Sequence, residues 1–137
     1  MSQTTDFAFA LFRAPDAPIF LRRVLTLDTA TAAPTTLILL VGAGTMGPLL
    51  GLPTELLRNV GFAFIPFVAL VTWAAVSPSR GLALTVGLLN AGWVLACIGA
   101  LVMGAIAPNA LGMAFVAGQA VFVGVLAELQ IIGARRM

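Results

Sequence analysis

The chain of 137 residues has no histidine, lysine or tyrosine, and it has a single cysteine. Without histidine, haem and zinc lose their commonest protein ligand, and acid–base catalysis near neutral pH loses its commonest residue. Cys97 stands alone, so it can form no disulfide within the chain, and the usual spacings of metal ligands are absent. We therefore expect no metal, no cofactor and no enzymatic activity.

Charged residues are also scarce, at 9% of the chain, whereas they make up roughly a quarter of an ordinary soluble domain. The basic residues are all arginine, and they stand singly or in pairs beside apolar segments. A nucleic-acid-binding surface needs basic residues gathered on one exposed face. We therefore expect no nucleic acid among the partners.

Hydrophobic residues make up 61% of the chain, and the mean hydropathy is +1.09. They run in blocks long enough to cross the ~30 Å hydrocarbon core of a bilayer. We predict membrane-spanning helices at about residues 24–47, 54–77, 82–106 and 110–133, in one domain over 24–137. The connections between the later blocks are short, so the predicted fold is all-α, an antiparallel bundle of four transmembrane helices surrounded by lipid.

Residues 1–23 are predicted to form a cytoplasmic or interfacial segment, whose phenylalanines can dip into lipid. The arginines beside the crossings set the orientation. One side of the predicted bundle carries most of them: Arg13, Arg22, Arg23, Arg80, Arg135 and Arg136. Only Arg58 falls on the other side. Because positive residues mark the cytoplasmic face, we predict that both termini are cytoplasmic.

Polar groups inside a membrane are costly, which makes them the first candidates for function. Asp28 follows the Arg22–Arg23 pair by about one turn, so we expect it near the cytoplasmic boundary. There it could be a helix N-cap or an ion-pair partner, or else a ligand for a proton or solute. Glu128 is expected to be the deepest carboxylate. It is either paired with an arginine at that boundary or a site of protonation.

The third predicted helix carries two stripes. Asn90, Trp93 and Cys97 are spaced i, i+3 and i+7, which places an amide, an indole and a thiol on one face. A second stripe consists of small residues at intervals of four: Gly92, Ala96, Ala100 and Gly104. Such ridges let helices approach closely, either within one bundle or between two copies of it.

The fourth predicted helix offers Gln119 and Gln130, eleven residues apart and nearly aligned on one face, with Glu128 pointing roughly opposite Gln130. Amides in membranes mostly bond to neighbouring helices. We expect that structural role for Asn90 and Gln119, with a substrate-binding amide as the alternative.

Four segments resemble a family of small, uncharacterised bacterial membrane proteins: LRRVLTLDTATA, LLGLPTELLRNVG, NAGWVL and GQAVFVGVLAELQ. The similarity covers about residues 20–136. The resemblance implies four membrane spans and a place in the bacterial inner membrane. It also marks four residues as candidate functional positions: Asp28, Asn90, Trp93 and Gln119. It implies no activity.

Two functions compete for this sequence. The first is a non-catalytic accessory or self-associating subunit that packs against other membrane helices, in a homo-oligomer or a larger membrane complex. The alternative is a small proton-coupled transporter or channel that acts as an oligomer, with Glu128 or Asp28 coupling solute to protons. A membrane enzyme is the weakest reading, because the sequence offers no nucleophile–base pair and no metal-ligand set.

Overall fold

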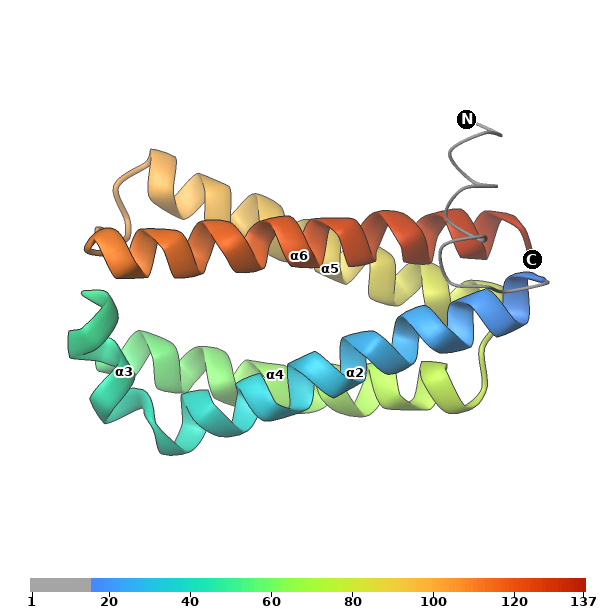
Figure 1. The fold of residues 1–137 in the computed structure, drawn as a ribbon, viewed down its shortest axis with the longest axis horizontal. Coiled ribbons are helices and arrows are strands. Elements are labelled where there is room, and N and C mark those ends of the chain that lie inside the picture. The colour runs from blue at the N-terminus through green and yellow to red at the C-terminus, as the bar shows by residue number, and fades with distance from the viewer. Residues whose placement is uncertain (1–15) are drawn as a thin grey trace.

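The computed structural model describes residues 16–137, which form helices joined by short turns. In chain order the helices are α2 (Ala17–Val41), α3 (Ala43–Leu50), α4 (Thr54–Val76), α5 (Arg80–Val102) and α6 (Ala110–Arg135). All but α3 are long and apolar enough to cross a membrane, which makes four candidate spans. The long helices lie along one axis, with α3 at one end and the last turn of α6 at the other (Figure 1). For residues 16–137, the prediction of an all-helical fold with four such helices is confirmed.

The first span begins earlier than the expected residue 24. The Asp16 carboxylate caps α2, since its Oδ1 accepts a hydrogen bond of 3.1 Å from the Ile19 amide, and Pro18 lies in the first turn. Residues 17–23 therefore belong to the helix, while the rest of the expected interfacial segment, 1–15, lies outside the described residues. The helix passes through Pro34 and ends at Val41, and α3 replaces the expected last turns at 42–47.

The next two spans also begin and end at local signals. Helix α4 starts at residue 54, as expected, directly after Pro53. Helix α5 starts at residue 80, slightly before the expected 82, because Ser79 Oγ accepts a 3.1 Å hydrogen bond from the Leu82 amide. It ends at residue 102 instead of 106, and Gly104 then turns the chain with a φ of 73°.

Asn109 starts α6 and joins it to α3. Its side-chain oxygen caps α6 by accepting a 2.8 Å hydrogen bond from the Gly112 amide. Its Nδ2 donates to the Leu49 carbonyl at 2.9 Å, and its backbone amide donates to the Leu50 carbonyl at 3.1 Å. Gly51 permits this contact, because its φ is 71° and a Cβ there would lie 2.7 Å from the Asn109 nitrogen. Hydrogen bonds of Asn109 therefore join the end of α3 to the start of α6 at this end of the bundle.

The long helices pack as two close pairs. Helix α2 packs most extensively on α4, and α5 on α6, whereas α4 and α5 are in contact far less extensively. A glycine allows the close approach in each pair. A Cβ at Gly61 of α4 would lie 3.0 Å from Leu40 of α2, and one at Gly87 of α5 would lie 2.9 Å from Ile131 of α6.

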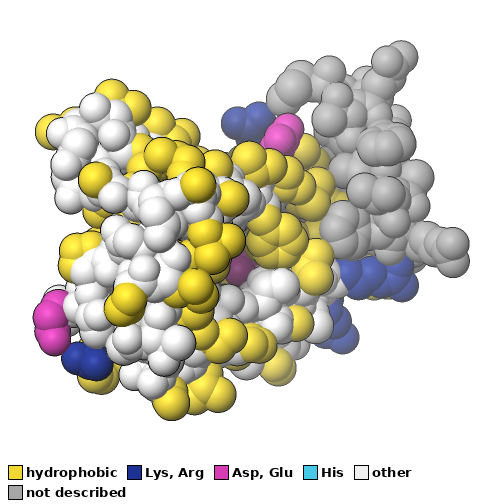
Figure 2. Space-filling model, turned by 60° about the vertical axis from the view of Figure 1, so that its left-hand side comes forward, with side chains coloured by type: hydrophobic (Ala, Val, Ile, Leu, Met, Phe, Trp, Pro, Cys, Tyr) yellow, Lys and Arg dark blue, Asp and Glu magenta, His cyan; other side chains and the backbone are white. Residues whose placement is uncertain are grey.

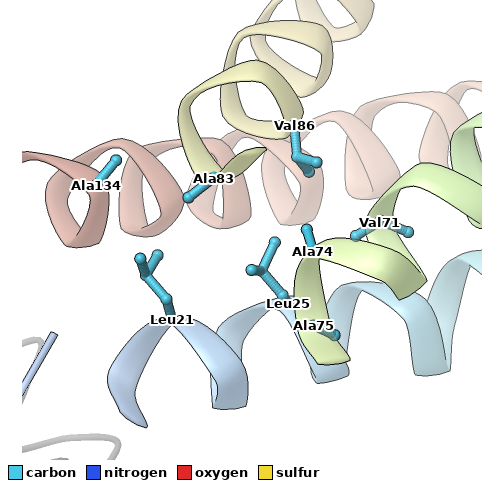
Figure 3. Close-up of a cluster of buried hydrophobic side chains, with 8 residues drawn as sticks. All are labelled: Leu21, Leu25, Val71, Ala74, Ala75, Ala83, Val86 and Ala134. Carbon is cyan, nitrogen blue, oxygen red and sulfur yellow. The ribbon is translucent and has the colours of Figure 1, made fainter. Parts of the chain in front are cut away.

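The apolar core is divided into clusters. One lies near the end where α2 begins and α6 ends, and Figure 3 shows that all four long helices contribute to it: Leu21, Leu25, Val71, Ala74, Ala75, Ala83, Val86 and Ala134. A second cluster lies towards α3: Leu39, Ala43, Leu50, Leu52, Leu57, Cys97 and Val116. Asp28 and Asn90, described below, are the buried polar side chains that neither cluster includes, together with Gln130 and Thr36.

The outer surface of the helices is apolar. Only 22–28% of the residues in the spanning windows are buried within the chain. Apolar side chains cover much of the face drawn in Figure 2, and one acidic side chain is recessed near its centre. A protein in water would lose stability by exposing such a surface, whereas in a bilayer this surface contacts lipid.

Candidate functional site

Three polar side chains from three helices meet in the middle of the bundle. Asn90 Nδ2 of α5 donates to Asp28 Oδ2 of α2 at 2.8 Å and to Gln130 Oε1 of α6 at 2.9 Å. Gln130 Nε2 donates to the same oxygen of Asp28 at 2.7 Å. Asp28 is 3% exposed and Gln130 0%. We call this closed ring of hydrogen bonds the Asp28 network.

Asp28 lies further from the start of its helix than the sequence led us to expect. Because α2 begins at Ala17, Asp28 is about 16 Å along the helix from its first residue. Asn90 is similarly about 15 Å from the start of α5. The reading of Asp28 as a helix N-cap is wrong, since Asp16 is the cap, and the partners of Asp28 are amides instead of arginines.

The second oxygen of the carboxylate is not used by the network. Both hydrogen bonds to Asp28 end on Oδ2, and within residues 16–137 Oδ1 accepts none. Neighbouring hydroxyls do not reach it. Thr31 and Thr35 return their hydroxyls to backbone carbonyls one turn earlier, as expected for threonine in lipid. Asp28 thus keeps a free acceptor beside the cavity described next.

A cavity of about 470 Å³ lies between the α2–α4 pair and the α5–α6 pair. All four long helices line it: Asp28, Thr31, Ala32, Thr35, Ala63, Phe64, Pro66, Phe67, Leu70, Leu89, Asn90, Trp93, Gln119, Phe122, Val123 and Leu126. The cavity opens on the side of the bundle, since Leu89 is 49% exposed and Phe122 40%. Asp28 is the only charged residue among those lining it in the described part of the chain.

A second polar group lies further along the bundle. Trp93 Nε1 donates to Gln119 Oε1 at 2.9 Å, and Gln119 Nε2 is 3.3 Å from Cys97 Sγ. Phe64 packs edge-on against Trp93, with ring centroids 5.1 Å apart. The predicted stripe of Asn90, Trp93 and Cys97 does face α6, and both amides bond across helices, as the structural reading expected.

A smaller cavity of about 160 Å³ continues beyond this group towards α3. Four side chains line both cavities and so stand between them: Thr35, Phe64, Trp93 and Gln119. The smaller cavity also touches Leu52 and Ile106, in the connections at the far end of the bundle. The two cavities therefore follow one another along the bundle axis.

The structure separates the remaining predicted residues from this site. Glu128 is exposed on the outside of α6, whereas Asp28 is buried between the helices, and the depth of Glu128 in the membrane stays a prediction. Its side chain and that of Gln130 do point in opposite directions, as expected. The ridge on α5 faces outward: Gly92 and Ala96 are exposed, no atom lies within 4 Å of a Cβ built on Gly92, and Gly104 lies beyond the end of α5.

Sequence reasoning missed the aromatic part of the cavity wall. Phe64 and Phe67 are spaced i, i+3 on α4, which places them on one helix face, and both line the cavity. That spacing was a usable signal, but it says nothing about which helix the face meets. Among residues 16–137, no group of three or more histidine, cysteine or acidic side chains could hold a metal ion.

Comparisons of the chain with protein-family models, with curated proteins and with solved structures give no match. The function is therefore inferred from the geometry of the Asp28 network and the cavities.

Proposed function

We propose that this chain is an integral protein of the bacterial inner membrane, a bundle of four antiparallel spans with both termini in the cytoplasm. The distribution of charge supports this orientation. Arg22, Arg23, Arg80, Arg135 and Arg136 lie at the ends of α2, α5 and α6 that gather at one end of the bundle, and Arg58 lies in the first turns of α4 at the other. Positive residues mark the cytoplasmic side.

We propose further that the bundle binds a small solute in the cavity and carries it across the membrane as an oligomer. The observation that supports this most is the free carboxylate oxygen of Asp28, about halfway along its helix, at the wall of an open apolar cavity. An ionised carboxylate is costly at that depth. Asp28 then holds either a proton or a positively charged partner, and Oδ1 is the free position for both.

A network that served only to hold the helices together would satisfy both carboxylate oxygens, because an unpaired acceptor in a dry interior costs about 1–3 kcal/mol. The Asp28 network leaves one carboxylate oxygen without a partner, and Asp28 lines a cavity large enough for a small molecule. The second cavity, beyond Trp93 and Gln119, gives a solute a direction in which to continue. These features favour transport over static binding.

Binding in the cavity can be measured through Trp93, which lines it. The chain has one other tryptophan, Trp73, which is 60% exposed, so Trp73→Phe leaves Trp93 as the only indole. We expect 1-bromo-4-tert-butylbenzene to quench Trp93 fluorescence in a saturable way, because bromine quenches an indole that it contacts. The measurement uses the full chain in mild detergent.

A matched pair of variants locates the binding. Ala32→Leu places a larger side chain in the cavity wall, whereas Ala69→Leu makes the same change at an exposed position of α4 outside both cavities. We expect the first to abolish saturable quenching and the second to leave it unchanged. The proposal would be refuted if quenching of the Trp73→Phe protein rose linearly with probe concentration, or if it saturated equally in both variants. Either result would show that the probe partitions into the detergent and does not bind in the cavity.

An accessory or self-associating subunit is the second candidate, and a different observation favours it. Gly92 and Ala96 of the small-residue stripe are exposed and are not used inside the bundle. Such a stripe permits close packing against a helix of another chain. Because a transporter of this size would itself act as an oligomer, self-association is compatible with both functions, whereas a stable complex with a different membrane protein would favour this second one.

A further inference from the structure

We propose that the solute is an amphipathic organic cation with a single positive charge, which docks its charged group on Asp28 Oδ1. This inference rests on the proposed function and specifies its solute. It is carried by the sign and position of the charge in the cavity wall. Asp28 is the only charged lining residue in the described part of the chain, and the arginines lie towards the ends of the helices.

The positioning of the carboxylate favours a cation. Asn90 and Gln130 both donate to Oδ2, which holds the carboxylate in place and leaves Oδ1 without a hydrogen-bond partner among residues 16–137. A positive group at Oδ1 would neutralise the buried carboxylate without disturbing either amide. An anion would meet a like charge in a poorly solvated site, where repulsion is strong.

The rest of the wall defines the rest of the ligand. Aromatic rings of Phe64, Phe67, Trp93 and Phe122 line the cavity, and aromatic faces attract organic cations as well as apolar groups. The volume of about 470 Å³ falls in the range of sites for small organic ligands. A metal ion would find one carboxylate and few other free oxygens, too few to replace its hydration shell.

The lateral opening provides a route for such a ligand. Leu89 and Phe122 stand at an exposed edge of the cavity on the apolar side of the bundle. An amphipathic cation concentrates in the bilayer through its apolar part, so it can enter between the helices from lipid. A strongly hydrated cation cannot take that route, because it would leave its water behind at high cost.

Three probes of the same frame separate charge from shape: (4-bromophenyl)trimethylammonium, its neutral isostere 1-bromo-4-tert-butylbenzene, and the anion 4-bromobenzenesulfonate. In the Trp73→Phe protein, we expect the cation to quench Trp93 at a concentration at least about tenfold lower than the anion requires. A tenfold difference in affinity is modest for a charge contact in a poorly solvated site. Equal affinity for the three probes would overturn the inference.

Variants of the two carboxylates provide the matched test. Asp28→Asn removes the charge but keeps an oxygen that can accept from Asn90 and Gln130. We expect it to weaken binding of the cation by about tenfold or more and to leave the neutral probe unaffected. Glu128→Gln removes an exposed charge from α6 and should change neither. Loss of cation binding in Glu128→Gln alone would overturn the assignment to Asp28.

The outcomes separate this inference from the function on which it rests. If none of the probes gives saturable quenching, the cavity binds no such solute and the proposed function fails. If the neutral probe saturates and the cation does not, solute binding stands and the cation is excluded. Should Asp28→Asn fail to fold, the comparison of the three probes on the Asp28-containing protein still decides, since it needs no change at the site.

Discussion

Replacing Gln130 by leucine tests whether the Asp28 network stabilises the bundle. Gln130 is fully buried and makes two hydrogen bonds to other helices, one to Asp28 and one from Asn90. Hydrogen bonds between membrane helices contribute about 0.6 kcal/mol on average and about 1.7 at most. Loss of both should therefore lower the free energy of unfolding by about 1.2 kcal/mol, with an upper limit near 3.4.

The measurement is reversible unfolding in mixed micelles with increasing dodecyl sulfate, followed by circular dichroism. Glu128→Gln is the control, because its exposed side chain lies on the same helix and takes no part in the network, and it should leave the unfolding free energy unchanged. An unaltered free energy in Gln130→Leu would refute the reasoning. It would mean that the buried amides find equally good partners in the unfolded state.

Two further predictions concern the glycines of α5. Gly87→Ala should destabilise the chain by about 1–3 kcal/mol in the same unfolding assay, because its new Cβ would lie 2.9 Å from Ile131. The control, Gly92→Ala, should cause no such loss, because no atom lies within 4 Å of a Cβ there. Equal effects of the two substitutions would mean that the α5–α6 contact is not close at Gly87. Gly92→Leu should dissociate an oligomer built on the outward stripe, as seen by light scattering in mild detergent, whereas Ala69→Leu should not. An unchanged mass in both would exclude that face as the interface.

The sequence was sufficient to locate the long helices, because each is a block of apolar residues bounded by charge, proline or glycine. Their ends were less predictable. The Arg22–Arg23 pair looked like the flank of the first span, although Asp16 and Pro18 carry the signals of a helix start. The expected start of the first span, residue 24, therefore fell seven residues after the observed start at Ala17, and Asp28 was placed too near the start of its helix.

The polar residues of the site were predictable from the sequence, but their contacts and the aromatic wall of the cavity were not. Asp28, Asn90 and Gln130 stand out because polar side chains are rare inside such spans. Their contacts join positions 62 and 102 residues apart, which helix periodicity alone does not specify. The cavity forms where the faces of four helices do not touch. No local pattern in a single sequence predicts where packed helices leave such a space.

The pairing of the helices divides the chain into two halves. The first contains α2, α3 and α4 and the second contains α5 and α6, and in each half the long helices that pack most closely are neighbours in sequence. Each half can therefore form as a hairpin during synthesis, before the other exists. Asp28 belongs to the first hairpin, and Asn90 and Gln130 belong to the second. The carboxylate acquires its amide partners and its cavity only when the hairpins dock, so neither half of the chain possesses the site alone.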